Sequence, residues 1–321
     1  MKKMFILASL AFVGMACSKN DDNVGVYNGG GDKVISNSTI SGDPFITEEP
    51  AVFPTQKEGT DQEYDLTTYT IENNKVKSVV IDNYVNGQKV NNATITTNVT
   101  YNAKGLPSKL EQTQDTETRT IEYIYNAKNQ IEEIKATHNN IATRYVHEYD
   151  AQGRLSKMTF SATNEQPYTI TYEYPTANTV VEKNSTNTNE SLTYTFENGN
   201  LTKKVLERFY QGKVVGSAVE EYKYDTTIKN PDASLELKLV DLNYYLEEDR
   251  YSPERSKNVV TEITKSGTDG QYELPKRISA TYTYEKNDKG YPTKKTETKA
   301  GNTPKVTTYT YSEITFIYIN Q

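Results

Sequence analysis

The feature that most constrains the fold of this chain is a tyrosine-rich phrase that recurs along it. Each copy has an alternating Tyr/Thr stretch, a turn of Asn, Asp or Gly type, a small apolar residue and a run with Lys. The clearest copies are VTYNAKGLPSKLEQT (99–113), IEYIYNAKNQIEEIKAT (121–137), YVHEYDAQGRLSKMTF (145–160), LTYTFENGNLTKKVLE (192–207) and ATYTYEKNDKGYPTKKTET (280–298). Such self-similarity indicates one supersecondary unit that is copied along the chain.

The last aromatic or apolar residue before each turn serves as an anchor that marks the repeat. Successive anchors lie 22 to 30 residues apart, with a single gap of 60. The anchors are Ile71, Tyr101, Tyr125, Tyr149, Tyr174, Phe196, Tyr224, Tyr284 and Tyr311. Tyrosines two positions apart, such as Tyr282 and Tyr284, are separated by polar residues, which is the pattern of a half-buried antiparallel strand. The repeat therefore predicts β-hairpins.

The turns support this prediction. Asn102 and Asp150 stand where a side chain can cap the backbone, and Gly105 and Gly153 stand where the chain must take a positive φ. Asn129 fills the glycine position in the second copy, as the next most tolerant residue. The apolar residues that follow are three or four apart rather than two, which predicts a bulge early in each return strand.

We therefore predict an all-β fold, an antiparallel meander of hairpins that forms a curled open sheet, a half-barrel or a short solenoid. The repeat domain should cover residues 61–321. A segment at 225–279 interrupts the repeat, across the long gap between Tyr224 and Tyr284. Leucines at 235, 239, 242 and 246 fit a helix there, and those at 235, 237 and 239 also fit a strand.

Tyr149-Asp-Ala-Gln-Gly-Arg-Leu155 resembles the YD-repeat, or RHS-like, pattern of bacterial surface proteins and toxin shells. The whole chain is similar to Bacteroidota lipoproteins of unknown function that carry such repeats. The resemblance covers residues 64–320 and includes Val240-Asp-Leu-Asn-Tyr-Tyr-Leu246 and Asp288-Lys-Gly-Tyr-Pro-Thr-Lys294. It implies the architecture, and it does not extend to a toxin domain.

The N-terminus predicts export and lipid attachment. Residues 1–16 have a basic start, a short apolar stretch and a small residue before Cys17, as in a lipoprotein signal peptide. Cys17 is the only cysteine, and we expect it to be lipidated; the alternative is a leftover thiol after ordinary signal cleavage. Asp21 and Asp22 resemble a signal for export to the outer face of the outer membrane. Residues 17–60 read as the lipidated cysteine and a flexible tether.

Composition limits the chemistry available. A net charge of −7 without a basic patch argues against nucleic-acid binding. The two histidines, His138 and His147, are not clustered, so no metal site or cofactor is predicted. The single cysteine is expected to be lipidated, so no thiol catalysis is predicted either. Clustered carboxylates occur at 132–133, 220–221 and 247–249. In the first two pairs, adjacent strand residues face opposite sides, so these pairs cannot converge unaided. We therefore predict that the protein is not an enzyme.

The interrupting segment offers one candidate recognition patch, made of Tyr244, Tyr245 and Tyr251. Departures from a repeat often carry the specific function of a repeat protein. The alternative, which the sequence favours, is a cap that covers an open edge of the sheet.

Together these features predict a lipid-anchored protein of the outer membrane, displayed at the cell surface, with a side facing the periplasm as the alternative. Its role would be non-catalytic, in binding, adhesion or as an accessory subunit. Its partners would be the outer membrane and either a glycan or an outer-membrane protein. Two alternatives are a carrier of an apolar ligand in the curled sheet and a glycan-active enzyme with two carboxylates about 5–10 Å apart.

Overall fold

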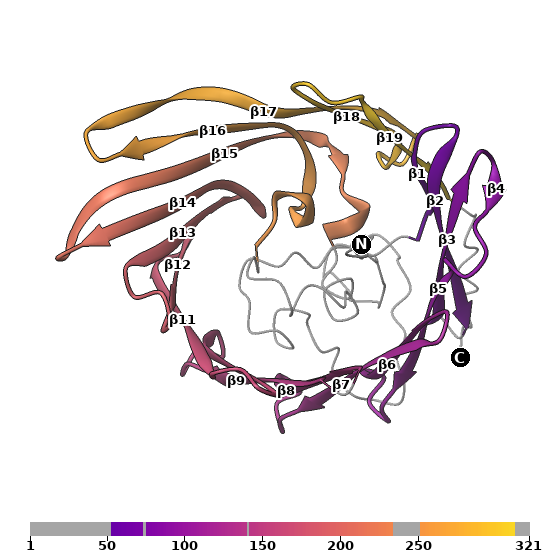
Figure 1. The fold of residues 1–321 in the computed structure, drawn as a ribbon, viewed down its shortest axis with the longest axis horizontal. Helices are drawn as coiled ribbons and strands as arrows, with labels where there is room; N and C mark the ends of the chain where they lie inside the picture. Colours follow the sequence, from indigo (N-terminus) through magenta and orange to yellow (C-terminus); the bar gives the residue numbers. More distant parts are fainter. Residues whose placement is uncertain (1–52, 73–74, 140, 234–250, 312–321) are drawn as a thin grey trace, which may run out of the picture.

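The computed structural model describes residues 53–72, 75–139, 141–233 and 251–311 (Figure 1). These residues form one 19-stranded sheet and two short 3-10 helices. The strands are β1 (Thr55–Gly59), β2 (Glu63–Glu72), β3 (Lys75–Val85), β4 (Gln88–Lys89), β5 (Ile95–Tyr101), β6 (Pro107–Gln114), β7 (Glu117–Tyr125), β8 (Ile131–His138), β9 (Ile141–Tyr149), β10 (Leu155–Ala162), β11 (Tyr168–Thr176), β12 (Thr179–Asn184), β13 (Glu190–Glu197), β14 (Asn200–Tyr210), β15 (Lys213–Lys229), β16 (Asn258–Asp269), β17 (Tyr272–Lys286), β18 (Pro292–Lys299) and β19 (Lys305–Thr310). The helices are η1 (Pro231–Ala233) and η2 (Pro253–Arg255).

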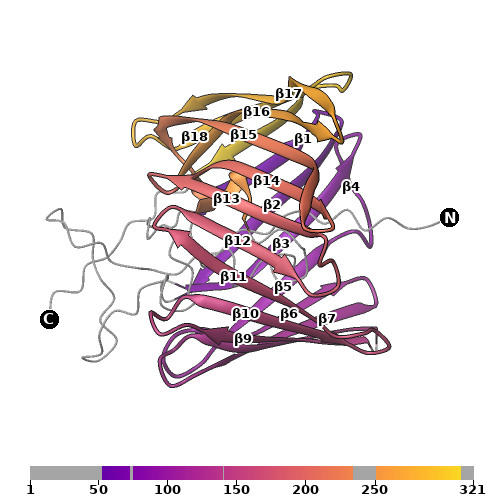
Figure 2. The ribbon, with the colours of Figure 1, turned by 90° about the vertical axis from the view of Figure 1, so that its left-hand side faces the viewer.

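The antiparallel meander of hairpins is confirmed, but the sheet is not open. Each strand except β4 pairs with the next along the chain, β3 pairs with both β4 and β5, and β1 pairs with both β2 and β19. The β1–β19 ladder runs from Thr55 opposite Thr310 to Gly59 opposite Val306. All strands except β4 therefore have two neighbours, and the meander closes into a ring (Figures 1 and 2).

The folded domain begins earlier in the sequence than we expected, because the strand that closes the ring precedes residue 61. We expected residues 17–60 to be a tether, yet β1 begins at Thr55 and completes the ring. The segment TQKEG has none of the tyrosine alternation that marks the other strands, so its role depends on partners far along the chain.

The buried face of the sheet points into the ring. The chain on either side of the segment 234–250 turns into the ring (Figure 1). There Tyr251 packs edge-on against Tyr194 and Phe196 of β13, with ring centroids 4.8 and 5.2 Å apart. These two residues alternate with exposed or half-buried ones, so their face is the inner wall. Further side chains that are at most 1% exposed extend this wall: Val76, Val79, Leu110, Ile121, Ile131, Ile134, Leu155, Val180 and Leu201.

The outer face carries charged pairs all round the ring. They alternate with the buried residues and bridge neighbouring strands or positions on one strand. The pairs are Glu72–Lys77, Lys109–Glu111, Glu133–Arg144, Glu148–Lys157, Glu173–Lys183, Lys223–Glu262 and Glu285–Lys294. The outer wall is thus water-facing in character. The described residues include no helix with the length and apolar character that crossing a bilayer requires.

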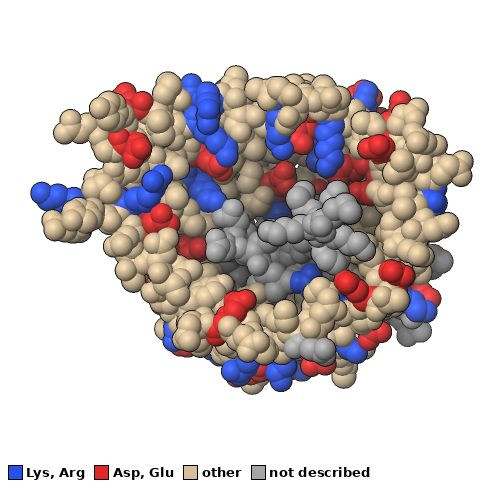
Figure 3. Space-filling view, in the orientation of Figure 1, with Lys and Arg blue, Asp and Glu red and all other residues tan. Residues whose placement is uncertain are grey.

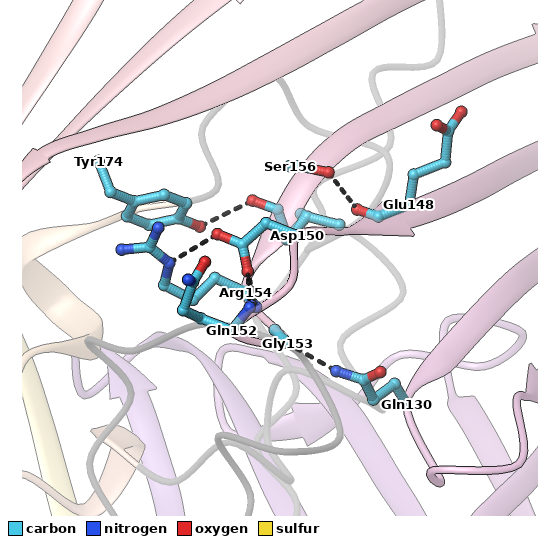
Figure 4. Close-up of polar contacts among 9 residues, drawn as sticks. Gln130, Glu148, Asp150, Gln152, Gly153, Arg154, Ser156 and Tyr174 are labelled. Atoms are coloured by element: carbon cyan, nitrogen blue, oxygen red, sulfur yellow. Dashed lines mark hydrogen bonds and ion pairs between the residues drawn. The ribbon is translucent and has the colours of Figure 1, made fainter.

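One end of the ring, which we call the tyrosine rim, is formed by the turns that follow the anchors. In the turn at 150–154, the Asp150 carboxylate accepts from the backbone N–H groups of Gln152 and Arg154 and from Arg154 Nε (Figure 4). Asn102, Asn126 and Asn287 bond the backbone of their turns in the same way. Positive φ values at Gly153 (80°) and Asn129 (62°) confirm the predicted turn geometry.

Every tyrosine anchor fastens two neighbouring hairpins at this rim. Its hydroxyl donates to a carbonyl near the start of the preceding return strand, over 2.5–3.0 Å. The pairs are Tyr101–Val76, Tyr125–Pro107, Tyr149–Ile131, Tyr174–Leu155, Tyr224–Leu201, Tyr284–Val260 and Tyr311–Pro292. The repeat therefore encodes a contact between units as well as the unit itself.

The predicted bulges are present. Opposite each of several anchors the return strand carries one extra residue, such as Ser108, Ser156 or Thr202. The hydroxyl of each of these three residues donates to a carbonyl on the partner strand. The extra residue explains why the first two apolar residues of a return strand, such as Ile131 and Ile134, are three apart and still face inward.

Candidate functional site

Three buried asparagines bind the chain on either side of residues 234–250 to the tyrosine rim. Asn258 donates its backbone N–H to Asn200 Oδ1, and Asn200 Nδ2 donates to Asn258 Oδ1, over 2.9 and 3.1 Å. Asn230 Nδ2 donates to the carbonyls of Glu254 and Ser256, each over 2.7 Å. Buried amides with every bond in place fix the two ends of the segment against β14 and β16.

Next to these asparagines, ionisable groups from four elements of the chain face one another inside the ring. Asp232 comes from η1, Arg255 from η2, Lys295 from β18 and Glu58 from β1. Figure 3 shows acidic and basic side chains along the inner edge of the ring on this side. The wall is thus apolar and aromatic along β3–β13 and ionisable near η1, η2, β18 and β1.

Burial dominates the electrostatics of this group. It raises the pKa of Asp232 from 3.8 to about 6, against the attraction of Lys295. It lowers the pKa of Arg255 to about 10, against the attraction of Asp232. Burial also acts to lower the pKa of Lys295, but Glu254, Glu58 and Asp232 outweigh it and hold that pKa above its ordinary value. The chain therefore keeps a protonatable carboxyl in a mixed-charge environment.

The predicted recognition patch is only partly within the described residues. Tyr251 is 5% exposed and packs in the aromatic wall, so its ring serves the core and presents no surface to a ligand. Tyr244 and Tyr245 lie outside the described residues, as do Cys17, Asp21 and Asp22.

The carboxylate pairs within the described residues do not converge, and the candidate at 247–249 lies outside those residues. Glu220 faces inward, where it accepts from the Tyr222 hydroxyl and pairs with Lys265, while Glu221 faces outward and pairs with Lys276. Hydrogen bonds from these partners hold the pKa of each carboxyl below its usual value, against burial. Glu133 likewise pairs with Arg144 on the outer face.

The histidines are also far from a catalytic arrangement. His147 is 5% exposed on the inner wall, among the tyrosines, as the alternation indicated. The Nε2 atom of His138 lies 3.6 Å from Oε2 of Glu117. Within the described residues, no group of three His, Cys, Asp or Glu side chains is placed to hold a metal ion.

The opposite end of the ring, the flap rim, holds the exposed apolar surface of the described residues. The eight large hydrophobic side chains that are exposed there are Val85, Ile141, Tyr210, Val214, Val215, Tyr272, Leu274 and Ile278. Six of them belong to the tips of the β14–β15 and β16–β17 hairpins, residues 208–218 and 265–279, which we call the flap. The two tips project beyond the rest of the ring (Figure 1).

The flap is long because β17 extends beyond its neighbour β18. β17 has 15 residues, whereas β18 has 8. The last residue of β18, Lys299, pairs with Ala280, so residues 272–279 of β17 pair only with β16 among the described strands. Tyr272 is 79% exposed, the highest value among these hydrophobic side chains.

Sequence reasoning missed the flap. The gap of 60 residues between Tyr224 and Tyr284 contains both the segment rooted at the tyrosine rim and a lengthened hairpin, and the two were interpreted as one interruption. A usable signal was present in the alternation Tyr272, Leu274 next to the turn Asp269-Gly270.

Comparisons with known proteins add little to this description. No family model matches the chain, and no curated protein matches it. The fold is similar to that of a porin-like protein from Bacteroides uniformis ATCC 8492, at 14% identity over 82% of this chain and all of that one, with a TM-score of 0.39. A porin-like protein from Bacteroides vulgatus ATCC 8482 gives 12% identity, coverage of 83% and 100%, and a TM-score of 0.40. The Photorhabdus luminescens Tc holotoxin pore gives 12% identity over 76% of this chain and 15% of that one, with a TM-score of 0.28. At these TM-scores we transfer nothing from those proteins.

Proposed function

We propose that this is a lipid-anchored protein of the cell envelope that binds a partner protein through the flap. The observation that supports this proposal is the distribution of exposed apolar side chains, which gather at one rim and mostly at its projecting tips. Apolar side chains that gather at one part of a surface, rather than being scattered singly over it, are typical of contact sites. The role is that of a non-catalytic binding or accessory subunit.

The topology separates anchor and flap. β1 begins at the tyrosine rim, because it runs antiparallel to β2, which ends at the anchor Ile71. The tether from Cys17 therefore joins the ring at the end opposite the flap. Lipidation at Cys17 would attach the chain to the membrane through the end of the ring opposite the flap and leave the flap accessible.

The outer wall fits this attachment. Its charged pairs suit water, whereas a barrel that crosses an outer membrane carries an apolar band outside. We therefore assign membrane attachment to the lipid on Cys17 and the signal role to Asp21 and Asp22, as the sequence predicts.

A crosslinking experiment in the native envelope tests the proposal. A photo-crosslinking amino acid replaces Tyr272 in one strain and the exposed Gln152 of the tyrosine rim in another. We expect the protein crosslinked from position 272 to be one species of defined mass, absent from position 152. Crosslinks that are equal at both positions, or absent from both, would refute a flap-bound partner.

The anchor is tested separately by mass spectrometry of the extracted protein. Acylation of Cys17, lost in Cys17→Ser together with membrane retention, is the expected result. An unmodified Cys17 in membrane-extracted protein would refute the anchor and leave the flap proposal to its own test.

A further inference from the structure

The flap has an open strand edge whose chemistry can be matched to a segment of this same chain. Along residues 272–279, β17 bonds β16 on one side, and no strand among the described residues pairs with its other side, because β18 ends at Lys299. An edge of this length leaves a row of backbone N–H and C=O groups that a further strand can pair with. Pro275 removes one donor from this row.

Both faces of this edge are apolar. Leu274 pairs with Gly267 and Ile278 with Thr264, and since these partners are three apart on β16, Leu274 and Ile278 lie on opposite faces. They are 51% and 56% exposed. A strand that completes the flap must therefore carry apolar side chains on both of its own faces.

Charge narrows the choice of the added strand further. Residues 208–218 and 265–279 contain five basic and two acidic side chains, and two of the basic ones, Lys265 and Lys276, pair with Glu220 and Glu221 of β15. Arg277 is exposed within the open edge. The added strand should accordingly carry negative rather than positive charge.

Residues 312–321, Ser-Glu-Ile-Thr-Phe-Ile-Tyr-Ile-Asn-Gln, have this chemistry. They lie outside the described residues. If the segment were extended, Ile314, Phe316 and Tyr318 would share one face, and Ile317 and Ile319 would share the other. All of these residue types favour strands, and the only charged residue of the segment is Glu313.

We propose that residues 314–319 of one copy add as a strand to the open edge of β17 in a second copy. This proposal rests on the proposed function, because it names the partner of the flap.

The C-terminal segment is too short to pair with the open edge of β17 in its own copy. Tyr311 lies beside Pro292, to whose carbonyl it donates, and the open edge begins beyond Lys299, seven residues and about 23 Å further along β18. Residues 314–319 are three to eight residues beyond Tyr311 and reach only about 10–26 Å. To lie along residues 272–279 they would have to extend to about 50 Å.

The contact is therefore heterologous. The donor segment leaves at the tyrosine rim of one copy and the acceptor edge lies at the flap rim of the next. Such head-to-tail contacts form open chains of copies unless the rotation that relates one copy to the next closes them into a cyclic oligomer. Each copy would donate once and accept once.

Two complementary variants test this assignment, both in the mature chain with Cys17→Ser. A chain that ends at Tyr311 keeps the acceptor and lacks the donor, while Leu274→Lys keeps the donor and places a charge in the acceptor. Light scattering should show concentration-dependent association of the parent chain, weakened at least about tenfold in either variant. Mixing the two variants should produce a one-to-one dimer that grows no further. Val85→Lys, exposed at the same rim outside the flap, is the matched control and should associate like the parent.

A parent chain that stays monomeric, association that survives both variants, or a mixture that stays monomeric would each overturn the assignment. Unchanged thermal unfolding of the variants excludes misfolding as the cause. If position 272 crosslinks to a different protein while the mixture stays monomeric, the strand donation fails and the proposed function stands. If position 272 crosslinks to nothing as well, both fail.

Discussion

At the tyrosine rim, anchor hydroxyls, Asx turns and the asparagines Asn200, Asn230 and Asn258 tie each hairpin to the next. Neighbouring turns are also bonded directly, as by Gln130 Nε2 to the Gly153 carbonyl over 2.8 Å (Figure 4). At the flap rim, the same meander extends four strands past their neighbours and exposes Tyr272 and Leu274. The same repeated hairpin thus has one end held by hydrogen bonds between neighbouring hairpins and one end without them. The tyrosine anchors make these bonds at the tyrosine rim, whereas at the flap rim β17 extends past β18.

The largest expected effect concerns closure, on which both rims depend. Lys57 pairs with Thr308 on one side and Leu66 on the other. Lys57→Pro places a proline in a strand with two neighbours and should cost about 3 kcal/mol or more of the free energy of unfolding in urea. The control Lys57→Thr should stay within about 0.5 kcal/mol. A proline cost below about 1 kcal/mol would mean that β1 lacks one of its neighbours and the ring is open.

The next effect is a pH dependence of stability, and it tests the charged groups inside the ring near the tyrosine rim. Because the pKa of Asp232 is raised from 3.8 to about 6, the folded chain binds this proton more tightly than the unfolded chain does. Its contribution to stability is therefore present below about pH 4 and lost as the pH rises through 6, on the order of 2–3 kcal/mol. Asp232→Asn should stabilise the protein by about 2 kcal/mol at pH 8 and change little at pH 4, in urea unfolding at both values.

Asp225 provides the control of opposite sign. The hydrogen bond from Thr227 lowers the pKa of its carboxyl, so its contribution is present above the ordinary pKa and lost as the pH falls through the folded value. Asp225→Asn should therefore destabilise at pH 8. The same sign of change in both variants would contradict this account of the interior charges.

A smaller effect compares one acidic residue from each rim. Asp150 accepts two backbone bonds and one from Arg154, whereas Asp269 is exposed at the flap tip. Asp150→Ala should cost about 1–2 kcal/mol in thermal unfolding, and Asp269→Ala at most about 0.5 kcal/mol. Equal costs would remove the contrast between the rims.

The smallest effect isolates the anchor hydroxyl. Tyr149→Phe deletes the bond to the Ile131 carbonyl and leaves the ring in place, so it should cost about 1 kcal/mol. Tyr272→Phe, at an exposed position of the flap, should cost close to nothing. The two midpoints of chemical denaturation, measured side by side, check the difference, and a neutral Tyr149→Phe would show that the anchors act through packing alone.

Local features of this fold could be predicted from the sequence. Alternating tyrosines gave the strands, Asn102 and Gly105 gave the turns, and the uneven apolar spacing gave the bulges. Each of these is a property of a few consecutive residues. The inward position of His147 followed from the same alternation.

Features that depend on distant partners could not be predicted. Ring closure pairs Thr55 with Thr310, and neither residue carries a mark of that pairing. The flap depends on where β18 ends relative to β17, a difference of length that no single segment reveals. Asp232 became notable only when folding brought β18 and β1 to it.

Hydrogen exchange along β17 tests the contrast between the rims most directly. In a dilute chain that ends at Tyr311, the amides of Ala280 and Thr281, which pair with both β16 and β18, should exchange at least about a hundredfold more slowly than those of residues 272–278, which pair with β16 alone. Equal protection along the whole strand would contradict an open edge at the flap and the binding role assigned to it.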